Sequence, residues 1–513
     1  MSHPMRKKKW SSSVHHFLYS TKEIDSCNLL NFQFQSTFAI FSLLLLRILV
    51  GFHHHSGEED HHGSSNRGAY GGDYEAQRHW MELTYHLPIG DWYYYDLEYW
   101  GLDYPPLTAF ISYLCGMGSH YFVGQESVAL LSSRGYEDPT HKAYMRATVL
   151  FLDFTIYFSA VWVLATSLSV NNNKVGDDDH HTNLRGKRFW TILVLSLLQP
   201  SLILIDHGHF QYNAVSLGLT LWSFYFMTKT GNNQKNSYCV WGSILFCLAL
   251  NFKQMTLYYA PAVFFYLLGR CFARKEGETQ SKLYLNAFGN IFSLGITVIM
   301  TFFVQWYPFI LFRKSYTTPK DAMLQVLKRI FPVQRGLFEG KVSNIWCALS
   351  VKPISIRDRL SSDAQLKLSL LCTTLLIAPF CIMLFNLGMK YHQRKKDTDH
   401  LEGLLWGSFG TSLSFFLASF QVHEKSILMA VSSVSVMVAN EELFVCWFSV
   451  VATWSMWHLL RTDRLEVPYF ICIFIFIFIA NDIIGTKSFS NRRIQSSSSY
   501  VRSTLKYLLV PLT

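Results

Sequence analysis

The sequence has little charge. Only 16% of its 513 residues are Asp, Glu, Lys or Arg, against about 25% in an ordinary soluble domain. Half of the residues are hydrophobic, and Phe (41) and Tyr (27) are unusually frequent. A single soluble domain of this length has no need of so many long apolar runs. The composition therefore excludes an ordinary soluble globular domain and favours a chain that lies in a lipid bilayer.

The ten cysteines are scattered and form no Cys-x-x-Cys pair, so neither a zinc site nor a disulfide framework is supported. Several lie inside apolar runs, where a thiol behaves as a small hydrophobe. No Asn-x-Ser/Thr glycosylation acceptor is present either. Histidines cluster at 53–55, 61–62 and 180–181, but in polar stretches that are typical of linkers. These patterns therefore do not support a metal site.

Apolar runs recur along most of the chain, and a helix needs about 17–25 residues to cross a hydrocarbon core. About twelve runs approach this length, which predicts an all-α, polytopic membrane protein. The predicted spans are 37–52, 143–169, 189–205, 212–228, 238–253, 256–270, 285–312, 365–388, 403–420, 425–440, 442–458 and 467–484.

The net charge of +10 comes mostly from basic residues between the apolar runs. This placement is typical of membrane topology and argues against a nucleic-acid partner. We expect a cytoplasmic N-terminal tail (1–36), a multi-span membrane domain (37–484) and a cytoplasmic C-terminal tail (485–513). Alternation of sides places the basic linkers on the same face: 171–188, 229–237, 270–282 and 388–400.

The same alternation places the long loop 53–142 on the opposite face. This loop contains the polar motif GlyGlyAspTyrGluAlaGlnArgHisTrp. Asp73 is the candidate general base, since a carboxylate at a membrane surface can take a proton from a sugar hydroxyl. Arg78 and Asp103 are candidates for contact with substrate or phosphate. The alternatives are a helix start with acidic residues in its first turn for Asp73, and turn chemistry before TyrProPro for Asp103.

A polar turn, AspHisGlyHisPheGlnTyrAsn (206–213), separates two apolar runs on this same face. Ionisable residues at membrane depth are costly and tend to mark substrate paths. His209 and Gln211 are therefore candidates for binding sugar or phosphate. The alternative is a polar hairpin between two spans.

Three further segments on this face supply cations. Lys253 suits a phosphate, and Gln254 beside it suits a sugar hydroxyl, although Lys253 can also snorkel to the interface. Arg335, in a shaped loop, can clamp phosphate or belong to a surface amphipathic segment. His423 and Lys425 interrupt an apolar stretch and together can neutralise a phosphate.

Taken in order, these motifs resemble the endoplasmic-reticulum glucosyltransferases of the lipid-linked oligosaccharide pathway. The resemblance covers most of 71–430 and rests on these stretches: GlyAspTyrGluAlaGlnArgHisTrpMetGlu, TyrTrpGlyLeuAspTyrProProLeuThrAla, AspHisGlyHisPheGlnTyrAsn, AsnPheLysGlnMet, ArgGlyLeuPheGlu and PheGlnValHisGluLysSerIleLeu. AspTyrGluAlaGlnArgHisTrpMet and AspHisGlyHis, with Gly208, are similar to the members that add the first glucose rather than the second.

The resemblance implies a GT-C glycosyltransferase fold in the endoplasmic-reticulum membrane, with Asp73 as catalytic base on a lumenal first loop. The donor would be dolichyl-phosphate-glucose and the acceptor Man(9)GlcNAc(2)-diphosphodolichol. Glucose would be transferred with inversion, forming an alpha-1,3 linkage, and no metal or cofactor is implied. The aromatic residues Trp80, Trp92, Tyr99 and Trp100 are our candidates for stacking on sugars.

Two other functions compete with this interpretation. The second-glucose enzyme of the same pathway shares much of the pattern. A polytopic transporter would place ionisable residues near mid-span and show inverted repeats, whereas here those residues gather at span ends and no repeat is visible. A transporter is therefore the less favoured alternative.

Overall fold

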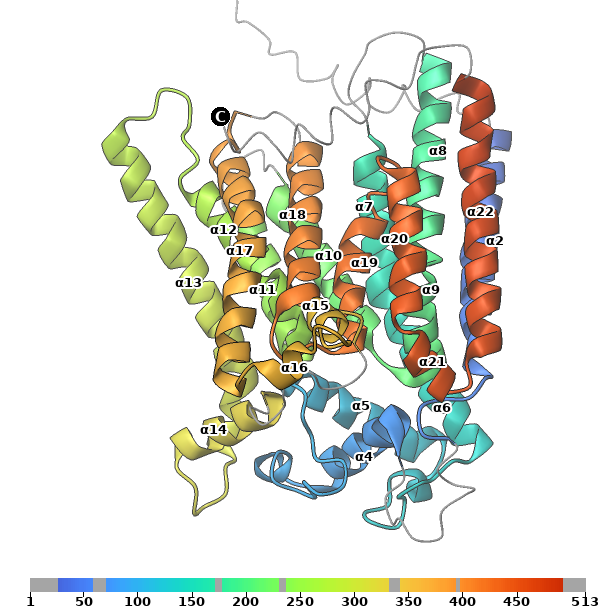
Figure 1. Ribbon diagram of the computed structural model, residues 1–513, viewed down its shortest axis with the longest axis vertical. Helices are drawn as coiled ribbons and strands as arrows, with labels where there is room; N and C mark the ends of the chain where they lie inside the picture. Colours follow the sequence, from blue (N-terminus) through green and yellow to red (C-terminus); the bar gives the residue numbers. More distant parts are fainter. Residues whose placement is uncertain are drawn as a thin grey trace, which may run out of the picture. The chain divides into compact units, whose positions relative to one another are not determined.

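The computed structural model describes residues 26–58, 71–170, 178–229, 237–331, 342–393 and 397–491. Within these ranges the chain is helical and contains no β-strand, so the predicted all-α class is confirmed. The helical elements in chain order (Figure 1) are α2 (Ser26–Gly51), α4 (Gly72–His86), η1 (Ile89–Asp91), α5 (Pro106–Phe122), η2 (Gln125–Val128), α6 (Pro139–Leu152), η3 (Asp153–Phe158), α7 (Ser159–Ser169), α8 (Asp178–Leu197), α9 (Pro200–Ile203), η4 (Leu204–Phe210), α10 (Asn213–Thr228), α11 (Ser237–Phe252), η5 (Gln254–Tyr259), α12 (Ala260–Cys271), α13 (Gln280–Leu311), α14 (Pro319–Ile330), α15 (Ile345–Leu349), α16 (Ile356–Arg359), α17 (Ser362–Met389), α18 (Asp397–Ala418), η6 (Glu424–Ser426), α19 (Ile427–Ser435), α20 (Glu442–Ser455), α21 (Trp457–Thr462) and α22 (Glu466–Asn491).

The chain forms two compact units, Met1–Arg47 and Ile48–Thr513. The first unit contains most of α2, which exposes the apolar side chains Phe38, Phe41 and Leu45. The second unit contains all the other described helices and every residue of the site considered below.

Every predicted apolar run falls on helical segments, but these differ in length. Among the described residues, five helical stretches are long and apolar enough to cross a membrane: Pro139–Ser169, Arg185–Phe210, Gln280–Leu311, Ser362–Met389 and Glu466–Ile484. Shorter apolar helices cover Thr37–Gly51, Ser237–Phe252 and Glu442–Ser455. The structure thus confirms several membrane-type helices, and a total of about twelve spans stays a prediction.

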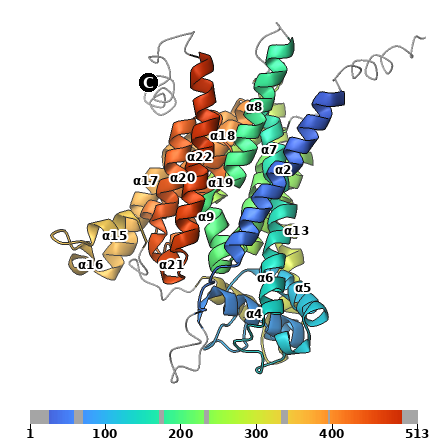
Figure 2. The same ribbon diagram turned by 90° about the vertical axis from the view of Figure 1, so that its right-hand side faces the viewer.

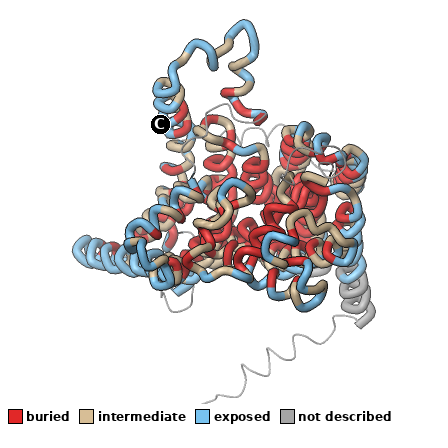
Figure 3. Tube along the Cα trace, turned by 90° about the horizontal axis from the view of Figure 1, so that it is seen from below, coloured by how far each residue is buried: buried red, intermediate tan, exposed pale blue. Residues whose placement is uncertain are grey.

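Helix α13 illustrates why these helices suit a bilayer. It exposes Phe288, Phe292 and Val304, and it forms the mostly pale-blue helix at the left of Figure 3. Exposed apolar surface of this extent is a liability in water but costs nothing against lipid. The buried residues, red in Figure 3, lie among the other helices of the second unit.

Helices α4 and α5 lie together at the lower end of the second unit's long helices in both Figure 1 and Figure 2. They approach closely at Gly116, where an added Cβ would stand 2.6 Å from the Met81 carbonyl oxygen. Trp80 and Leu83 of α4 pack with Phe309 of α13 in a buried apolar cluster. This packing fixes the helix that carries Asp73 to the membrane helices.

Two wide π-helical turns, η3 and η4, interrupt longer helices. Such turns are rare and occur frequently at functional sites. η4 ends at Phe210, whose positive φ of 84° turns the chain, and Gln211 is extended before α10 begins. The polar motif 206–213, predicted as a turn between two spans, therefore begins inside the π-helix η4, and the chain turns only at its end, between Phe210 and Asn213.

Candidate active site

Asp73 lies in the first turn of α4, and Gly71 is the capping residue. Its carboxylate therefore does not cap the helix, although Asp73 and Glu75 are the acidic residues of the first turn, as the structural alternative predicts. Ser56 ties this helix start to η4: its Oγ accepts the Asp73 N–H at 3.2 Å, and its own N–H donates to the His209 carbonyl at 3.1 Å. The side chain and the backbone of Ser56 thus link the backbones of Asp73 and His209.

Glycine is required where these two segments meet. Gly57 and Gly72 both have positive φ, at 86° and 89°. A Cβ on Gly57 would stand 1.9 Å from the Gly71 carbonyl oxygen, and one on Gly72 would stand 2.2 Å from that of Ser56. Gly57 and Gly72 therefore allow backbone to pack directly on backbone.

Three side chains hold one oxygen of Asp73. The Nε2 atom of His209 lies 2.7 Å from Oδ2, the side-chain amide of Gln211 donates to the same atom, and the Lys425 ammonium forms an ion pair with it. None of the hydrogen bonds or ion pairs among the described residues uses Oδ1. The carboxylate is thus anchored through one oxygen, and the other oxygen is available to an incoming hydroxyl.

The electrostatics favour an ionised base. Burial alone would raise the pKa of Asp73, but the charges of Lys425 and His209 and their hydrogen bonds hold that pKa well below its usual value. The side chain still keeps 26% of its surface exposed. An ionised and oriented carboxylate can accept a proton as a general base, and its lowered pKa makes it a weaker base than an unpaired carboxylate.

A second layer fixes the amide of Gln211. Lys253 is buried and donates to Gln211 Oε1 at 2.8 Å and to Asn213 Oδ1 at 2.6 Å. Asn213 in turn donates to Asp206, which also accepts the Ala214 N–H at the start of α10. Because Lys253 takes the amide oxygen of Gln211, the amide nitrogen must face Asp73.

Residues 43–512 match the family described as the ALG6, ALG8 glycosyltransferase family. The chain belongs to this glycosyltransferase family. It is 42% identical over 410 residues to "Dolichyl pyrophosphate Man9GlcNAc2 alpha-1,3-glucosyltransferase" of Gallus gallus, covering 79% of this chain and 72% of that protein. The protein of the same name from Saccharomyces cerevisiae is 34% identical over 504 residues, covering 96% of this chain and 81% of that protein. The "Probable" counterpart in Schizosaccharomyces pombe is 36% identical over 468 residues, 89% and 81% of the two chains.

In this glycosyltransferase the structure brings together the largest group of residues singled out from the sequence. Asp73, His209, Gln211, Lys253 and Lys425 form one connected cluster, although they come from four separate segments. The clustering supports their assignment to one site.

The remaining predicted residues lie around this cluster or apart from it. His423 is exposed and its ring lies 3.3 Å from Glu424. Gln254 donates to the Ile330 carbonyl at 3.5 Å. Asp103 is half-buried beside Tyr104, whose hydroxyl reaches Gln211 Oε1 at 3.5 Å. Arg335 lies outside the described residues.

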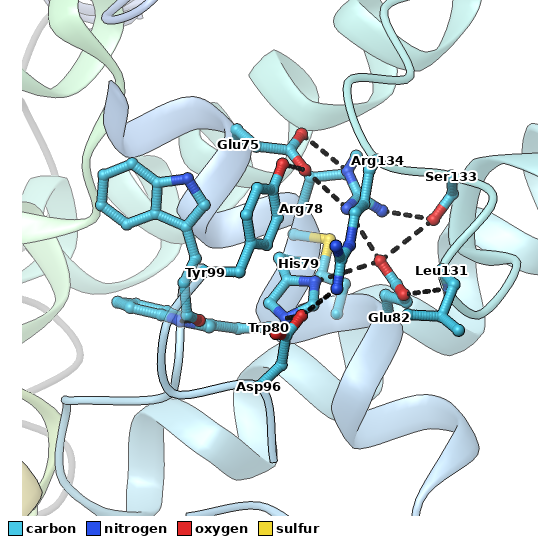
Figure 4. Close-up of polar contacts among 12 residues, drawn as sticks. Glu75, Arg78, His79, Trp80, Glu82, Asp96, Tyr99, Leu131, Ser133 and Arg134 are labelled. Carbon is cyan, nitrogen blue, oxygen red and sulfur yellow. Dashed lines mark hydrogen bonds and ion pairs between the residues drawn. The ribbon is translucent and has the colours of Figure 1, made fainter. Parts of the chain in front are cut away.

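Arg78 occupies a buried ionic network rather than the cluster (Figure 4). Its guanidinium donates to Glu75 Oε1 at 2.7 Å, to Glu82 Oε2 at 2.8 Å and to Ser133. Its side chain is fully buried. Because these carboxylates already neutralise its charge, the placement favours a structural role over the predicted contact with phosphate. The i−3 and i+4 spacing of the two glutamates on one helix is the signal that could have indicated it.

The aromatic residues that were predicted to stack on sugars lie in different environments. Trp80 and Trp92 are buried in the apolar cluster of α4, and their indole N–H groups donate to the Trp100 and Leu87 carbonyls, each at 2.9 Å. Tyr99 donates to Glu75 at 2.8 Å and joins the ionic network. Burial favours a core role for the two tryptophans over stacking on sugar.

Sequence reasoning missed Asp463. Its carboxylate contacts Nδ1 of His209, and it lies in the short turn between α21 and α22. The only signal was a charged residue in a short turn between apolar runs. Ser56, which joins Asp73 to His209, has no signal in the sequence at all.

Proposed function

We propose that this glycosyltransferase adds the first glucose to the lipid-linked N-glycan precursor. It transfers glucose from dolichyl-phosphate-glucose to the terminal mannose of Man(9)GlcNAc(2)-diphosphodolichol in an alpha-1,3 linkage. The family, and relatives whose names specify a Man9GlcNAc2 acceptor, support this assignment. The observation that carries it is Asp73: one oxygen is anchored by three donors and the other is left for an acceptor hydroxyl.

In this proposal Asp73 takes the proton of the 3-hydroxyl of the terminal mannose through Oδ1. The mannose oxygen attacks the anomeric carbon of glucose from the face opposite the phosphate. The bond from that carbon to the phosphate oxygen breaks, and dolichyl phosphate leaves with the electron pair. A single displacement converts the beta-linked donor into an alpha-linked product.

Cations around Asp73 stabilise the departing phosphate in the proposal. Lys425 is the first of them, because it already reaches the site through its ion pair with Asp73. Lys253 is linked to Asp73 through Gln211, to which it donates a hydrogen bond. His423, two positions before Lys425, and Arg335, from the sequence pattern, complete the proposed set. His209 and Gln211 orient the base, while Asp103 and Gln254 are proposed to contact the sugars.

The same proposal assigns a GT-C fold with about twelve spans in the endoplasmic-reticulum membrane. The loop 53–142 lies on the lumenal face, and the tails 1–36 and 485–513 lie in the cytoplasm. The distribution of basic residues in the sequence supports this topology, and the long exposed apolar helices support a lipid environment.

A transfer assay on the full chain in lipid nanodiscs tests the proposal. It uses dolichyl-phosphate-glucose with lipid-linked acceptors that carry zero glucose or one glucose. Transfer to the glucose-free acceptor, with an alpha-1,3 product, is the expected result. Preference for the acceptor that already carries one glucose would assign the second-glucose reaction instead. No transfer to either acceptor, with movement of lipid between leaflets in proteoliposomes, would favour the transporter.

A further inference from the structure

His209 lies between two carboxylates. Its Nε2 faces Asp73 Oδ2 at 2.7 Å, and its Nδ1 faces Asp463 Oδ2 on the other side of the ring. Asp463 is almost completely buried, with 5% of its side chain exposed. A continuous series of contacts, from carboxylate to imidazole to carboxylate, therefore connects α4, η4 and the turn after α21.

The turn that carries Asp463 is built tightly against η4. Asp463 caps the C-terminus of α21, and Arg464 follows with a positive φ of 55°. The Leu465 N–H then donates to the Leu460 carbonyl at 2.9 Å. An added Cβ on Gly208 would stand 2.9 Å from the Leu465 side chain. Gly208 thus lets the turn approach closely enough for Asp463 to reach His209.

The two contacts determine the charge of the ring. An ionised carboxylate only accepts hydrogen bonds, and a neutral imidazole carries one N–H. In a neutral His209, the lone pair of one ring nitrogen would therefore point at a lone pair of a carboxylate oxygen. With both carboxylates ionised, both contacts are satisfied only when both ring nitrogens carry protons, and in that state His209 is an imidazolium.

We infer that Asp463 is a positioning residue that holds His209 protonated and aimed at Asp73, and so keeps the catalytic base ionised. The inference rests on the proposed function, because Asp73 must act as a base for the effect to reach turnover. Asp463 acts through His209 and does not touch the substrate. This role resembles that of other buried carboxylates that orient a histidine and stabilise its protonated form.

Several charged groups face the two residues concerned. Those around His209 are Asp73, Asp463 and Lys425. Those around Asp73 are His209 from η4, Lys425 from η6, Lys253 from the α11–η5 junction, and Tyr104 from the segment before α5. If Asp463 loses its charge, His209 can release a proton and Asp73 loses one cation. Lys425 remains, so Asp73 still works as a base but binds its own proton more tightly.

The test compares Asp463→Asn with the wild-type chain in the transfer assay. The asparagine amide can still accept from Nδ1, so the orientation of His209 survives while the charge is lost. We expect the acid limb of kcat, measured with saturating donor, to move to higher pH by about one unit, with the donor KM changed by less than about twofold. Asp153→Asn is the matched control, because Asp153 forms another buried pair, with His207 of the same η4 at 2.9 Å. Its acid limb should coincide with wild type.

His209→Gln provides an independent variant, since its amide can still donate to Asp73 but carries no charge. It should reproduce the shift of the acid limb, and adding Asp463→Asn to it should shift the limb no further. A folded Asp463→Asn or His209→Gln chain with the wild-type acid limb would overturn the inference. Absence of transfer by the wild-type chain would overturn the proposed function instead, so the two failures are distinct.

Discussion

The Nε2 atom of His209 lies 2.7 Å from Oδ2 of Asp73, across 136 positions of the chain. This contact requires the start of α4 and the end of η4 to meet at one end of the helices that separate them. Alternation of apolar runs predicts the same meeting, because it places the loop 53–142 and the turn 206–213 on one face of the membrane. The site therefore depends on topology as much as on local chemistry.

Asp73→Asn should abolish transfer. The amide keeps the size of the carboxylate but cannot accept a proton, and a general base contributes about 10²–10⁴-fold to rate. We expect kcat to fall at least about a hundredfold while binding of dolichyl-phosphate-glucose survives, as measured by titration of labelled donor. Asp91→Asn is the control, because Asp91 is paired with Lys314 at 2.7 Å, outside the site. Turnover by Asp73→Asn near the control level would remove the catalytic assignment.

Lys425→Met should slow transfer more than His423→Ala does. Lys425 is paired with Asp73, whereas the His423 ring is about half exposed and lies beside Glu424. Loss of the ammonium also relieves the lowering of the Asp73 pKa, so the acid limb of kcat should move to higher pH. We expect a loss in kcat of about 10²-fold, as for removal of one group that stabilises developing charge. Equal kinetics for the two variants would contradict the different positions of Lys425 and His423.

Sequence reasoning was most successful where one segment carries the whole signal. Apolar runs indicated the helices, and polar residues between them indicated His209, Gln211, Lys253 and Lys425 as well as Asp73, because ionisable groups at membrane depth need a reason. It could not locate Asp463, since one acidic residue in a short turn looks the same whether it faces water or a histidine.

For Arg78, in contrast to Asp463, the sequence contained the information needed to predict its ion pairs. Glu75 and Glu82 lie at helical spacing on either side of it, which predicts a local ion pair once the helix is recognised. The π-helical turns η3 and η4 could not be foreseen, since no residue pattern distinguishes them from α-helix. They arise from tertiary packing and polar contacts that appear only in three dimensions.

Gly72→Ala should disrupt the site without touching a catalytic group. Its φ of +89° disfavours any side chain, and a Cβ there would stand 2.2 Å from the Ser56 carbonyl oxygen. The start of α4 must then move away from Ser56, which breaks the alignment of Asp73 with His209. We expect a loss of at least about 2 kcal/mol in unfolding free energy, seen as a lower melting temperature, together with a large loss of kcat.

The matched control is Gly289→Ala in α13, where nothing lies within 4 Å of an added Cβ and φ is not positive. This change should leave the melting temperature equal or slightly higher, since alanine favours helix. If Gly72→Ala melts like Gly289→Ala and retains activity, the close backbone contact at Ser56 does not matter for the site.

Glu82→Gln should weaken the fold in a pH-dependent way. Burial alone would raise the pKa of Glu82, but the hydrogen bond from His79 and the charge of Arg78 lower it to about 2, below the value of about 4.3 in an unfolded chain. A lowered carboxyl pKa stabilises the fold fully above the unfolded value, and this stabilisation is lost as the pH falls from about 4.3 toward 2. At neutral pH the substitution removes one of the two carboxylates that pair with the buried Arg78 guanidinium in the network of Figure 4, and the lost stabilisation of the ionised carboxylate costs about 3 kcal/mol.

Melting temperatures of the detergent-solubilised chain, measured from neutral pH down to about pH 3, check this expectation. The gap between wild type and Glu82→Gln should be widest at neutral pH and should narrow below about pH 4.3, because the wild-type chain loses the same interaction by protonation. Glu98→Gln serves as the control, since Glu98 is exposed, and its melting temperature should follow wild type throughout. A gap that stays constant with pH would show that Glu82 stabilises the helix through its shape and hydrogen bonds to Leu131 and Ser133 rather than through its charge.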